Sequence, residues 1–177
     1  ETKSYIIEDD YDSEFRYNSR PIPSLQGMDQ SDRVIYLGTF SKSVAPSLRV
    51  GYMVLPSSLL SAYNKRMKIL GSFVSSFEQR LLNEFIISGQ FEKHINRMRK
   101  IYRAKRELML EELGKFKRNI KVLGDDAGQH VLIELSGKYP ADVLCARAAE
   151  LGVKVYPLSL YSIGRLPPLR QKQLLLG

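Results

Sequence analysis

One lysine stands between two serines on a short turn, in the stretch GTFSKSVAPSLRVGY (residues 38–52), and an arginine follows seven positions later. Lys42 and Arg49 are preceded by an acidic run, EDDYDSEF, in which Asp9 and Tyr11 stand two positions apart. A lone lysine is usually a solvated surface charge, and Lys42 lacks the preceding glycine of a Walker phosphate loop. Triphosphate binding is therefore disfavoured, and the four side chains are best considered as one set.

The set suits a phosphorylated aromatic aldehyde that carries a ring nitrogen and a ring hydroxyl. A lysine amine forms a Schiff base with an aldehyde, a carboxylate keeps a ring nitrogen protonated, and a phenol hydrogen-bonds a ring hydroxyl. Arginine, with serine or threonine, binds the phosphate. Pyridoxal 5'-phosphate is such a molecule. Taken singly, Asp9 could cap a turn, Tyr11 could belong to the core, and Arg49 could pair with a nearby carboxylate.

Three short apolar runs, at residues 4–9, 33–40 and 48–56, must position this set. Their lengths, β-branched and aromatic content, and polar turns predict buried strands of an α/β sheet. Asp9 and Tyr11 lie at the carboxyl end of the first run, and Lys42 and Arg49 lie between the second and third. Open α/β sheets place their ligands in such a region.

The pattern then becomes helical. Residues 57–70 and 75–89 predict two helices that end at Gly71 and Gly89. A longer helix follows over residues 90–116, with one apolar stripe at helical spacing made of Phe91, Ile95, Met98, Tyr102 and Met109. Seven cations are expected on the rest of its surface: Lys93, Arg97, Arg99, Lys100, Arg103, Lys105 and Arg106. They form a solvated face or, alternatively, a surface that tracks a nucleic-acid backbone.

Beyond Gly114 the pattern predicts a smaller α+β region. Strands are expected near residues 119–124, 130–137 and 153–157, a helix over 141–151, and a last strand in QLLLG (173–177). We therefore expect part of a large domain over residues 1–90, a linking helix over 91–116 and a small domain, truncated at its end, over 117–177.

Composition sets broad limits. The 177 residues are 44% hydrophobic and carry a net charge of +8, a weak indication of polyanion binding. The single Cys145 cannot form an internal disulfide, which fits a reducing cytoplasm. No apolar run approaches the roughly 20 residues of a membrane span. His94 and His130 show no metal-ligand spacing, so no metal site is expected. The first residue is not methionine, and we expect a piece of a longer protein.

The runs IIEDDYDSEFRY and VIYLGTFSKSVAPSLRVGYMVLP resemble the aminotransferase-like domain of the MocR/GabR regulators over the whole chain. The resemblance implies a fold-type I, pyridoxal phosphate-dependent aminotransferase large domain plus a smaller α+β domain. It makes Lys42 the Schiff-base lysine, Asp9 the partner of the ring nitrogen and Tyr11 that of the ring hydroxyl. It also implies that Arg49 binds the phosphate, assisted by Thr39 and Ser41.

The resemblance further implies a cytoplasmic homodimer that binds DNA through a winged-helix domain outside this chain. A small amine or amino-acid-like effector would displace Lys42 from its internal aldimine and favour another arrangement of the small and large domains. Aminotransferases of this family carry an arginine at the position of Leu175, so the resemblance implies little or no transaminase activity. The arginine of GABA-responsive members is Leu160 here. Arg165 and Arg170 are the candidate substitutes.

Two alternatives for the function stay open from the sequence, and the effector is also left open. The chain could belong to a working aminotransferase, or it could be a cofactor-free structural or nucleic-acid-binding module that uses the basic helix 93–106. The effector could be another amino compound, a D-amino acid, a peptide-like ligand or pyridoxal phosphate itself.

Overall fold

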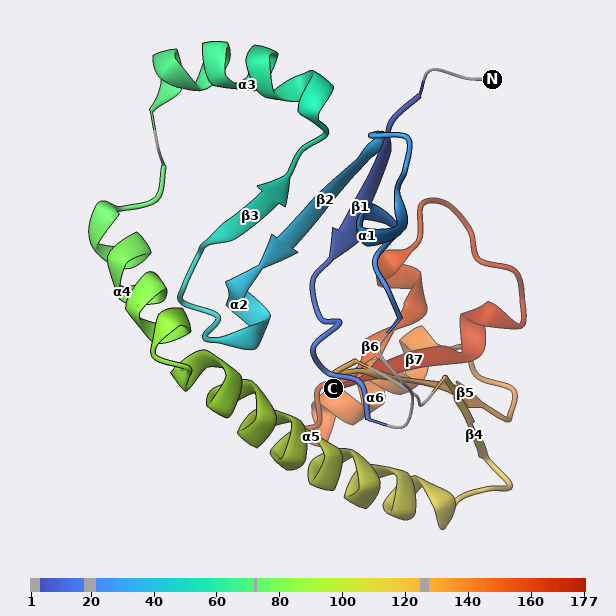
Figure 1. Ribbon diagram of the computed structural model, residues 1–177. Helices are drawn as coiled ribbons and strands as arrows, with labels where there is room; N and C mark the ends of the chain where they lie inside the picture. The colour runs from blue at the N-terminus through green and yellow to red at the C-terminus, as the bar shows by residue number, and fades with distance from the viewer. Residues whose placement is uncertain (1–3, 18–21, 72, 125–127) are drawn as a thin grey trace. The chain divides into compact units, whose positions relative to one another are not determined.

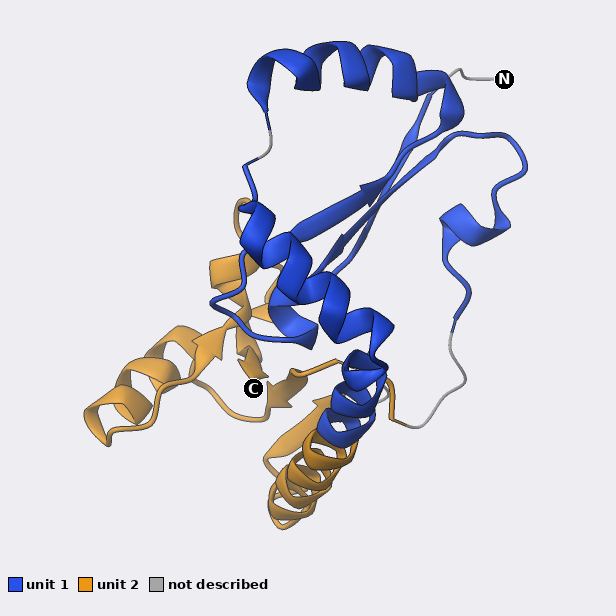
Figure 2. Cartoon of the chain, turned by 60° about the vertical axis from the view of Figure 1, so that its left-hand side comes forward, with its two compact units in different colours: residues 1–14, 20–99 blue, residues 15–19, 100–177 orange. Residues whose placement is uncertain are grey.

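The computed structural model of the chain describes residues 4–17, 22–71, 73–124 and 128–177. The chain divides into two compact units, which Figure 2 shows in different colours. Unit 1 comprises residues 1–14 and 20–99, and unit 2 comprises residues 15–19 and 100–177. The second boundary falls inside one long helix. The three-part division expected from the sequence stays a prediction.

Unit 1 contains a three-stranded sheet in the order β1 (Ile6–Asp10), β2 (Val34–Thr39), β3 (Gly51–Val54). Strands β1 and β2 are parallel, whereas β3 is antiparallel to β2. The carboxyl ends of β1 and β2 therefore lie at the same edge of the sheet as the amino end of β3, and the arrows in Figure 1 follow this arrangement. This edge is where the candidate chemistry gathers.

The three strands were expected to be buried, and for β1 and β3 this prediction is wrong. Ile7 is 66% exposed, and all four residues of β3 are exposed. Within the described residues, no further strand pairs with the outer edge of β1 or of β3. The two strands therefore have the apolar composition of buried strands, but their side chains are exposed.

The helices of unit 1 follow local signals in the sequence. They are α1 (Leu25–Met28), α2 (Phe40–Ser43), α3 (Ser57–Leu70) and α4 (Ser76–Ile87). Gly71 caps α3 with a φ of 71°, and Gly89 beyond α4 has the same φ, as expected for glycines that end helices. Both predicted ends are confirmed.

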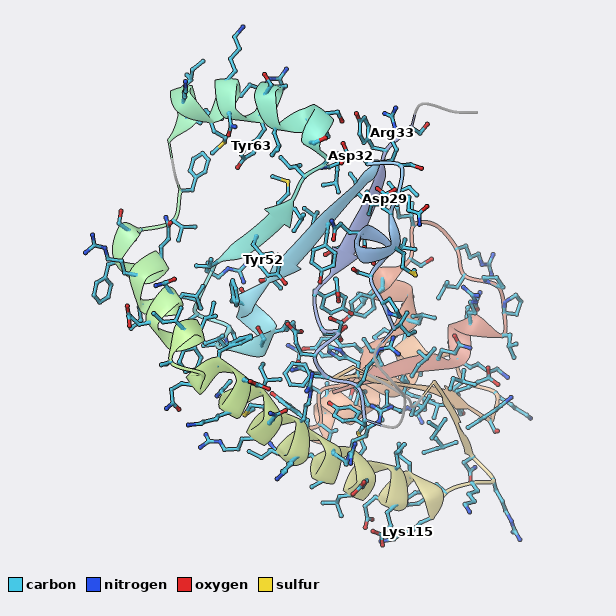
Figure 3. All side chains as sticks on the ribbon, viewed as in Figure 1. Asp29, Asp32, Arg33, Tyr52, Tyr63 and Lys115 are labelled. Carbon is cyan, nitrogen blue, oxygen red and sulfur yellow. The ribbon has the colours of Figure 1, made fainter. Side chains whose placement is uncertain are left out.

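The start of α3 is capped from another part of the chain. Its own N-cap position is Pro56, which makes no side-chain cap bond. The Asp32 carboxylate, from the turn before β2, instead accepts hydrogen bonds from the Ser57 amide at 2.9 Å, the Ser57 hydroxyl at 2.5 Å and the Ser58 amide at 3.3 Å. Figure 3 labels Asp32 beside the end of α3. A carboxylate at this end also complements the helix dipole.

The long helix α5 (Gln90–Gly114) has the expected apolar stripe, and Ile95 on it is only 5% exposed. One expectation for this helix is wrong. Arg106 was placed among the solvated cations, but it is 6% exposed. It stands four positions after Tyr102 and three before Met109, so helical spacing puts it on the stripe itself. Among the described residues, no helix is long and apolar enough to cross a membrane.

Unit 2 is built on an antiparallel sheet in the order β4, β5, β7, β6. The strands are β4 (Ile120–Leu123), β5 (Val131–Leu135), β6 (Tyr156–Pro157) and β7 (Gln173–Leu176), with helix α6 (Ala141–Glu150). Val131, Ile133, Ala141 and Leu174 form its buried core.

Strand β6 is shorter than the five residues expected. Pro157 has no amide hydrogen to extend the ladder. The chain turns there into the 3-10 helix η1 (Leu158–Tyr161), and a second one, η2 (Arg170–Lys172), precedes β7.

Candidate functional site

The two adjacent carboxylates that end β1 face opposite sides of the sheet. In the register of the sheet, Asp9 lies beside Leu37 and Asp10 beside Gly38. Because side chains alternate along a strand, Asp9 shares a face with Leu37 and Thr39, while Asp10 shares the other face with Tyr36. Asp9 is exposed, whereas Asp10 accepts hydrogen bonds from the Tyr36 hydroxyl at 2.7 Å and the Ser13 amide at 3.2 Å. Asp10 therefore caps the turn, whereas the exposed Asp9 makes no side-chain hydrogen bond within the described residues.

Lys42 and Arg49 lie on the connection that leaves β2 and returns as β3. Lys42 is in α2, which begins directly after Thr39, and Arg49 stands one residue before Val50. Both are exposed. Within the described part of the chain, neither the Lys42 ammonium nor the Arg49 guanidinium has a hydrogen-bond or ion-pair partner. The structure thus does not contain the ion pair that was the plain alternative for Arg49.

Thr39 and Ser41 are engaged with the backbone of this same connection. The Thr39 hydroxyl donates to the Val50 carbonyl at 3.3 Å and accepts from the Ser41 amide at 3.1 Å. The Ser41 hydroxyl donates to the Leu48 carbonyl at 2.7 Å. Both side chains are half-buried. Their hydroxyl groups hold the connection against α2.

Tyr11 directly follows β1 and is 47% exposed. The pKa of its phenol is raised above the ordinary value, first by the neighbouring Asp12 carboxylate, then by partial burial and by Asp9. Negative charges nearby disfavour the phenolate. Tyr11 therefore stays protonated near neutral pH and keeps a hydroxyl that can donate a hydrogen bond.

A cluster of aromatic rings on the opposite face was not predicted from the sequence. The Tyr36 and Tyr52 ring centres are 6.1 Å apart, and Tyr52 also lies 5.2 Å from Phe40, the first residue of α2. Burial, followed by the hydrogen bond to Asp10, raises the pKa of Tyr36. A Cβ at Gly38 would overlap the Tyr52 ring, so any larger residue there would force that ring to shift. The available signal was the pair Tyr36 and Phe40, four positions apart in VIYLGTF, together with Tyr52 in RVGY.

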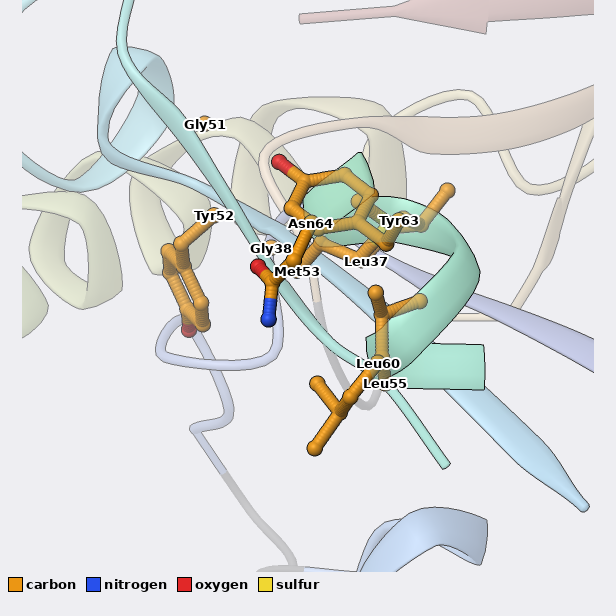
Figure 4. Close-up of a pocket in the computed structure, with 9 residues that line it drawn as sticks. All are labelled: Leu37, Gly38, Gly51, Tyr52, Met53, Leu55, Leu60, Tyr63 and Asn64. Carbon is orange, nitrogen blue, oxygen red and sulfur yellow. The ribbon is translucent and has the colours of Figure 1, made fainter. Parts of the chain in front are cut away.

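Figure 4 shows a pocket of about 560 Å³ bordered by β2, β3 and α3. Its lining is mostly apolar and includes Leu37, Met53, Leu60 and Tyr63. Asp9, Lys42 and Arg49 do not line it. The candidate site is therefore the cluster at the edge of the sheet, and this pocket is a separate feature.

The candidate effector residues belong to unit 2. Arg165 and Arg170 are exposed, and Arg170 begins η2. Leu175, which the resemblance sets at an arginine position of aminotransferases, is half-buried in β7. Leu160 in η1 is 67% exposed. The site assignments of both units stay predictions.

The donor set fits pyridoxal phosphate. The edge of the sheet in unit 1 carries an amine, a guanidinium and a carboxylate that are all exposed, together with a protonated phenol. These are the groups needed for an aldehyde, a phosphate, a ring nitrogen and a ring hydroxyl. The same residues offer little to a metal ion, since Lys42 and Arg49 would repel it.

The family model for aminotransferase class I and II matches residues 2–166. The chain therefore belongs to this family, whose members are pyridoxal phosphate-dependent.

The most similar relatives include transcriptional regulators. The chain is 48% identical over 164 residues to the HTH-type transcriptional regulator YdeL of Bacillus subtilis, covering 90% of this chain and 35% of that protein. It is 36% identical to the probable rhizopine catabolism regulatory protein MocR of Rhizobium meliloti, covering 88% of this chain and 32% of the relative. The expected resemblance to MocR/GabR regulators is confirmed. The chain spans about a third of the length of these relatives.

The fold also matches solved enzymes. The kynurenine aminotransferase of Pyrococcus horikoshii superposes with a TM-score of 0.82 at 28% identity, over 97% of this chain and 42% of that one. The predicted fold class, part of a fold-type I large domain with a smaller α+β domain, is confirmed.

Proposed function

We propose that this chain is the effector-sensing, pyridoxal phosphate-binding part of a bacterial transcriptional regulator of the MocR/GabR type. The observation that carries the proposal is the gathering of Asp9, Lys42 and Arg49 at one edge of the sheet without partners of their own among the described residues. Relatives described as HTH-type regulators support the regulatory role. DNA binding by the whole protein and its assembly as a homodimer are part of the same proposal.

Each side chain has one task in this proposal. The cofactor supplies an electrophilic aldehyde carbon that reacts reversibly with primary amines. The Lys42 amine would hold that carbon, and the Asp9 carboxylate would keep the proton on the ring nitrogen. Tyr11 donates a hydrogen bond to the ring hydroxyl. Arg49 would bind the phosphate. Thr39 would add a hydroxyl there by turning away from the Val50 carbonyl, to which it donates at 3.3 Å, a longer and weaker bond than that of Ser41.

An amine effector would compete with Lys42 for the same carbon. One carbon–nitrogen bond would form as the other breaks, so Lys42 would become a free primary amine in a new position. Two states that differ in the placement of one cation can differ in DNA affinity. An amine sensor therefore needs Lys42 but needs no onward chemistry.

The first experiment is a visible absorption spectrum of the intact protein with added pyridoxal phosphate, followed by borohydride reduction and mass spectrometry. An adduct on Lys42 is expected, and Lys42→Ala should abolish both the adduct and the effect of amines on DNA affinity. If neither the intact protein nor its variants acquire an adduct, the cofactor assignment is wrong. An effector that changes DNA affinity equally in Lys42→Ala would contradict the sensing role.

Arg165 and Arg170 are proposed to bind the carboxylate of an amino-acid-like effector. The test compares an amino acid with the matching amine that lacks the carboxylate, each titrated against the absorption band of the loaded protein. Arg165→Ala or Arg170→Ala should weaken the response to the amino acid alone. An equal loss for both ligands would exclude carboxylate binding by these arginines.

Catalytic transamination is a second candidate, favoured by the family match and by the superposition on a kynurenine aminotransferase. Leu175 argues against it, because leucine cannot pair with a substrate carboxylate. Turnover of an amino donor and a keto acid by the intact protein would establish it.

Nucleic-acid binding by α5 has less support, since several of its cations have other contacts. Arg99 donates to the Glu14 carbonyl, Arg103 donates to the Tyr17 carbonyl, and Arg106 is buried. A salt-dependent DNA shift by this chain that is unaffected by Lys42→Ala would favour this function.

A further inference from the structure

The carbonyl groups on both sides of Arg49 are fixed by residues that immediately precede Lys42. On one side, the Leu48 carbonyl accepts the Ser41 hydroxyl at 2.7 Å. On the other side, the Val50 carbonyl accepts the Phe40 amide at 3.0 Å and the Thr39 hydroxyl at 3.3 Å. The residues on both sides of Arg49 thus accept hydrogen bonds from Thr39, Phe40 and Ser41, the three residues before Lys42. We call these bonds the bracket around Arg49.

The Ser41 bond is the short link in this bracket. A serine hydroxyl has one hydrogen to donate. At 2.7 Å from the Leu48 carbonyl, that hydrogen is already used, and a phosphate dianion has only acceptors to offer. Ser41, assigned to the phosphate from the resemblance, therefore has no donor left for it in this arrangement. Its half-buried hydroxyl instead joins the backbone beside Lys42 to the backbone beside Arg49.

We propose that Ser41 is a positioning residue: its hydrogen bond to Leu48 holds the backbone that carries Arg49 beside the backbone that carries Lys42, and thereby sets phosphate-dependent cofactor affinity. The inference rests on the proposed function. Without the Ser41 bond, the Leu48 amide still donates a hydrogen bond to the Ala45 carbonyl at 3.0 Å. The Leu48 carbonyl, however, is no longer tied to the residue before Lys42. The guanidinium then samples more positions, and part of its binding free energy is spent on ordering it.

The test measures dissociation constants of the intact protein for pyridoxal phosphate and for pyridoxal, which lacks the phosphate. Ser41→Ala should weaken pyridoxal phosphate binding about three- to tenfold, the usual worth of one hydrogen bond. Pyridoxal affinity should stay unchanged, because Lys42, Asp9 and Tyr11 are intact. Ser41→Thr, which keeps a hydroxyl, should restore the affinity. Ser47→Ala, an exposed serine on the same connection, is the matched control and should change neither constant.

A double-mutant cycle separates positioning from direct contact with phosphate. If Ser41 acts through Arg49, Ser41→Ala should have no further effect in an Arg49→Ala background. If Ser41 itself contacts the phosphate, its effect should persist there, and the inference is wrong. It is equally wrong if Ser41→Ala binds both ligands as the parent does. Ser41→Cys, with a poorer donor of similar size, replaces Ser41→Ala in the cycle if that variant does not fold.

These outcomes are distinct from failure of the proposed function. If the parent protein forms no adduct on Lys42, the function itself is wrong. If the adduct forms and the phosphate contribution is independent of Ser41, the function stands and the positioning role falls.

Discussion

Two groups of basic side chains in this chain have opposite surroundings. In unit 1, Lys42 and Arg49 are exposed and have no partner among the described residues. In unit 2, Arg103 donates to the Tyr17 carbonyl, while Arg106 donates to the His130 carbonyl at 3.5 Å and lies 5.6 Å above the Tyr17 ring. The denser cluster of cations therefore serves the fold in part, whereas the sparser pair is available for a ligand. The number of charges alone does not identify a binding site.

The largest expected difference is between Lys42→Ala and Arg106→Ala. The first should abolish the borohydride-stable adduct and leave the urea midpoint unchanged. The second should lower the free energy of unfolding by about 2–3 kcal/mol, because a buried charged hydrogen-bonding group is removed, and should keep the adduct. Lys93→Ala, an exposed cation on α5, should change neither. An Arg106→Ala protein of unaltered stability would refute the structural role of this arginine.

Two glycines, one in each unit, give the next contrast. Gly38→Ala places a methyl group against the Tyr52 ring and should destabilise the protein by about 1–2 kcal/mol. Gly114→Ala at the end of α5 should be close to neutral, since the added Cβ would lie 3.8 Å from the Lys117 Cε atom, an ordinary van der Waals distance. Thermal denaturation of both variants measures the difference. Equal midpoints would mean that the Tyr52 ring moves aside without cost.

The smallest expected effect concerns Asp32. Its carboxylate is exposed, as the Lys42 and Arg49 side chains are, but unlike them it has hydrogen-bond partners, because it caps α3. Hydrogen bonds from the Ser57 hydroxyl and amide lower the pKa of Asp32. A lowered pKa stabilises the fold above the unfolded value of about 3.9, and the stabilisation is lost as the pH falls through that value toward the folded one. Asp32→Asn should therefore lower stability at pH 7 and flatten the loss of stability below about pH 4.

Urea midpoints measured from pH 7 to pH 2 test this prediction, with Glu111→Gln, an exposed carboxylate on α5, as the control. A pH dependence in Asp32→Asn as steep as that of the parent would assign the acid sensitivity to other carboxylates.

The order of elements and the edge that gathers the site could be predicted from the sequence, because both depend on local signals. Apolar runs, Gly71 and the positions of Lys42 and Arg49 relative to the strands are all visible along the chain. The contacts of Asp10 and Tyr36 were not predicted, since they depend on the register between two strands. The burial of Arg106 follows from its helical spacing, whereas its charge favours a solvated position. The Ser41 bond to Leu48 depends on how the connection folds back.

The alternation along β1 has a practical consequence for transplanting this site. Three acidic residues in succession would let the strand slip by one position while still presenting a carboxylate at the edge, and such a slip would turn every side chain to the other face. Two features oppose it: the Tyr36 hydroxyl holds Asp10, and the Leu25 and Gln26 amides hold Glu8 at 2.8 and 2.9 Å. Transfer of the site to another sheet would therefore need the hydrogen-bond partners of Glu8 and Asp10 as well as Asp9 itself.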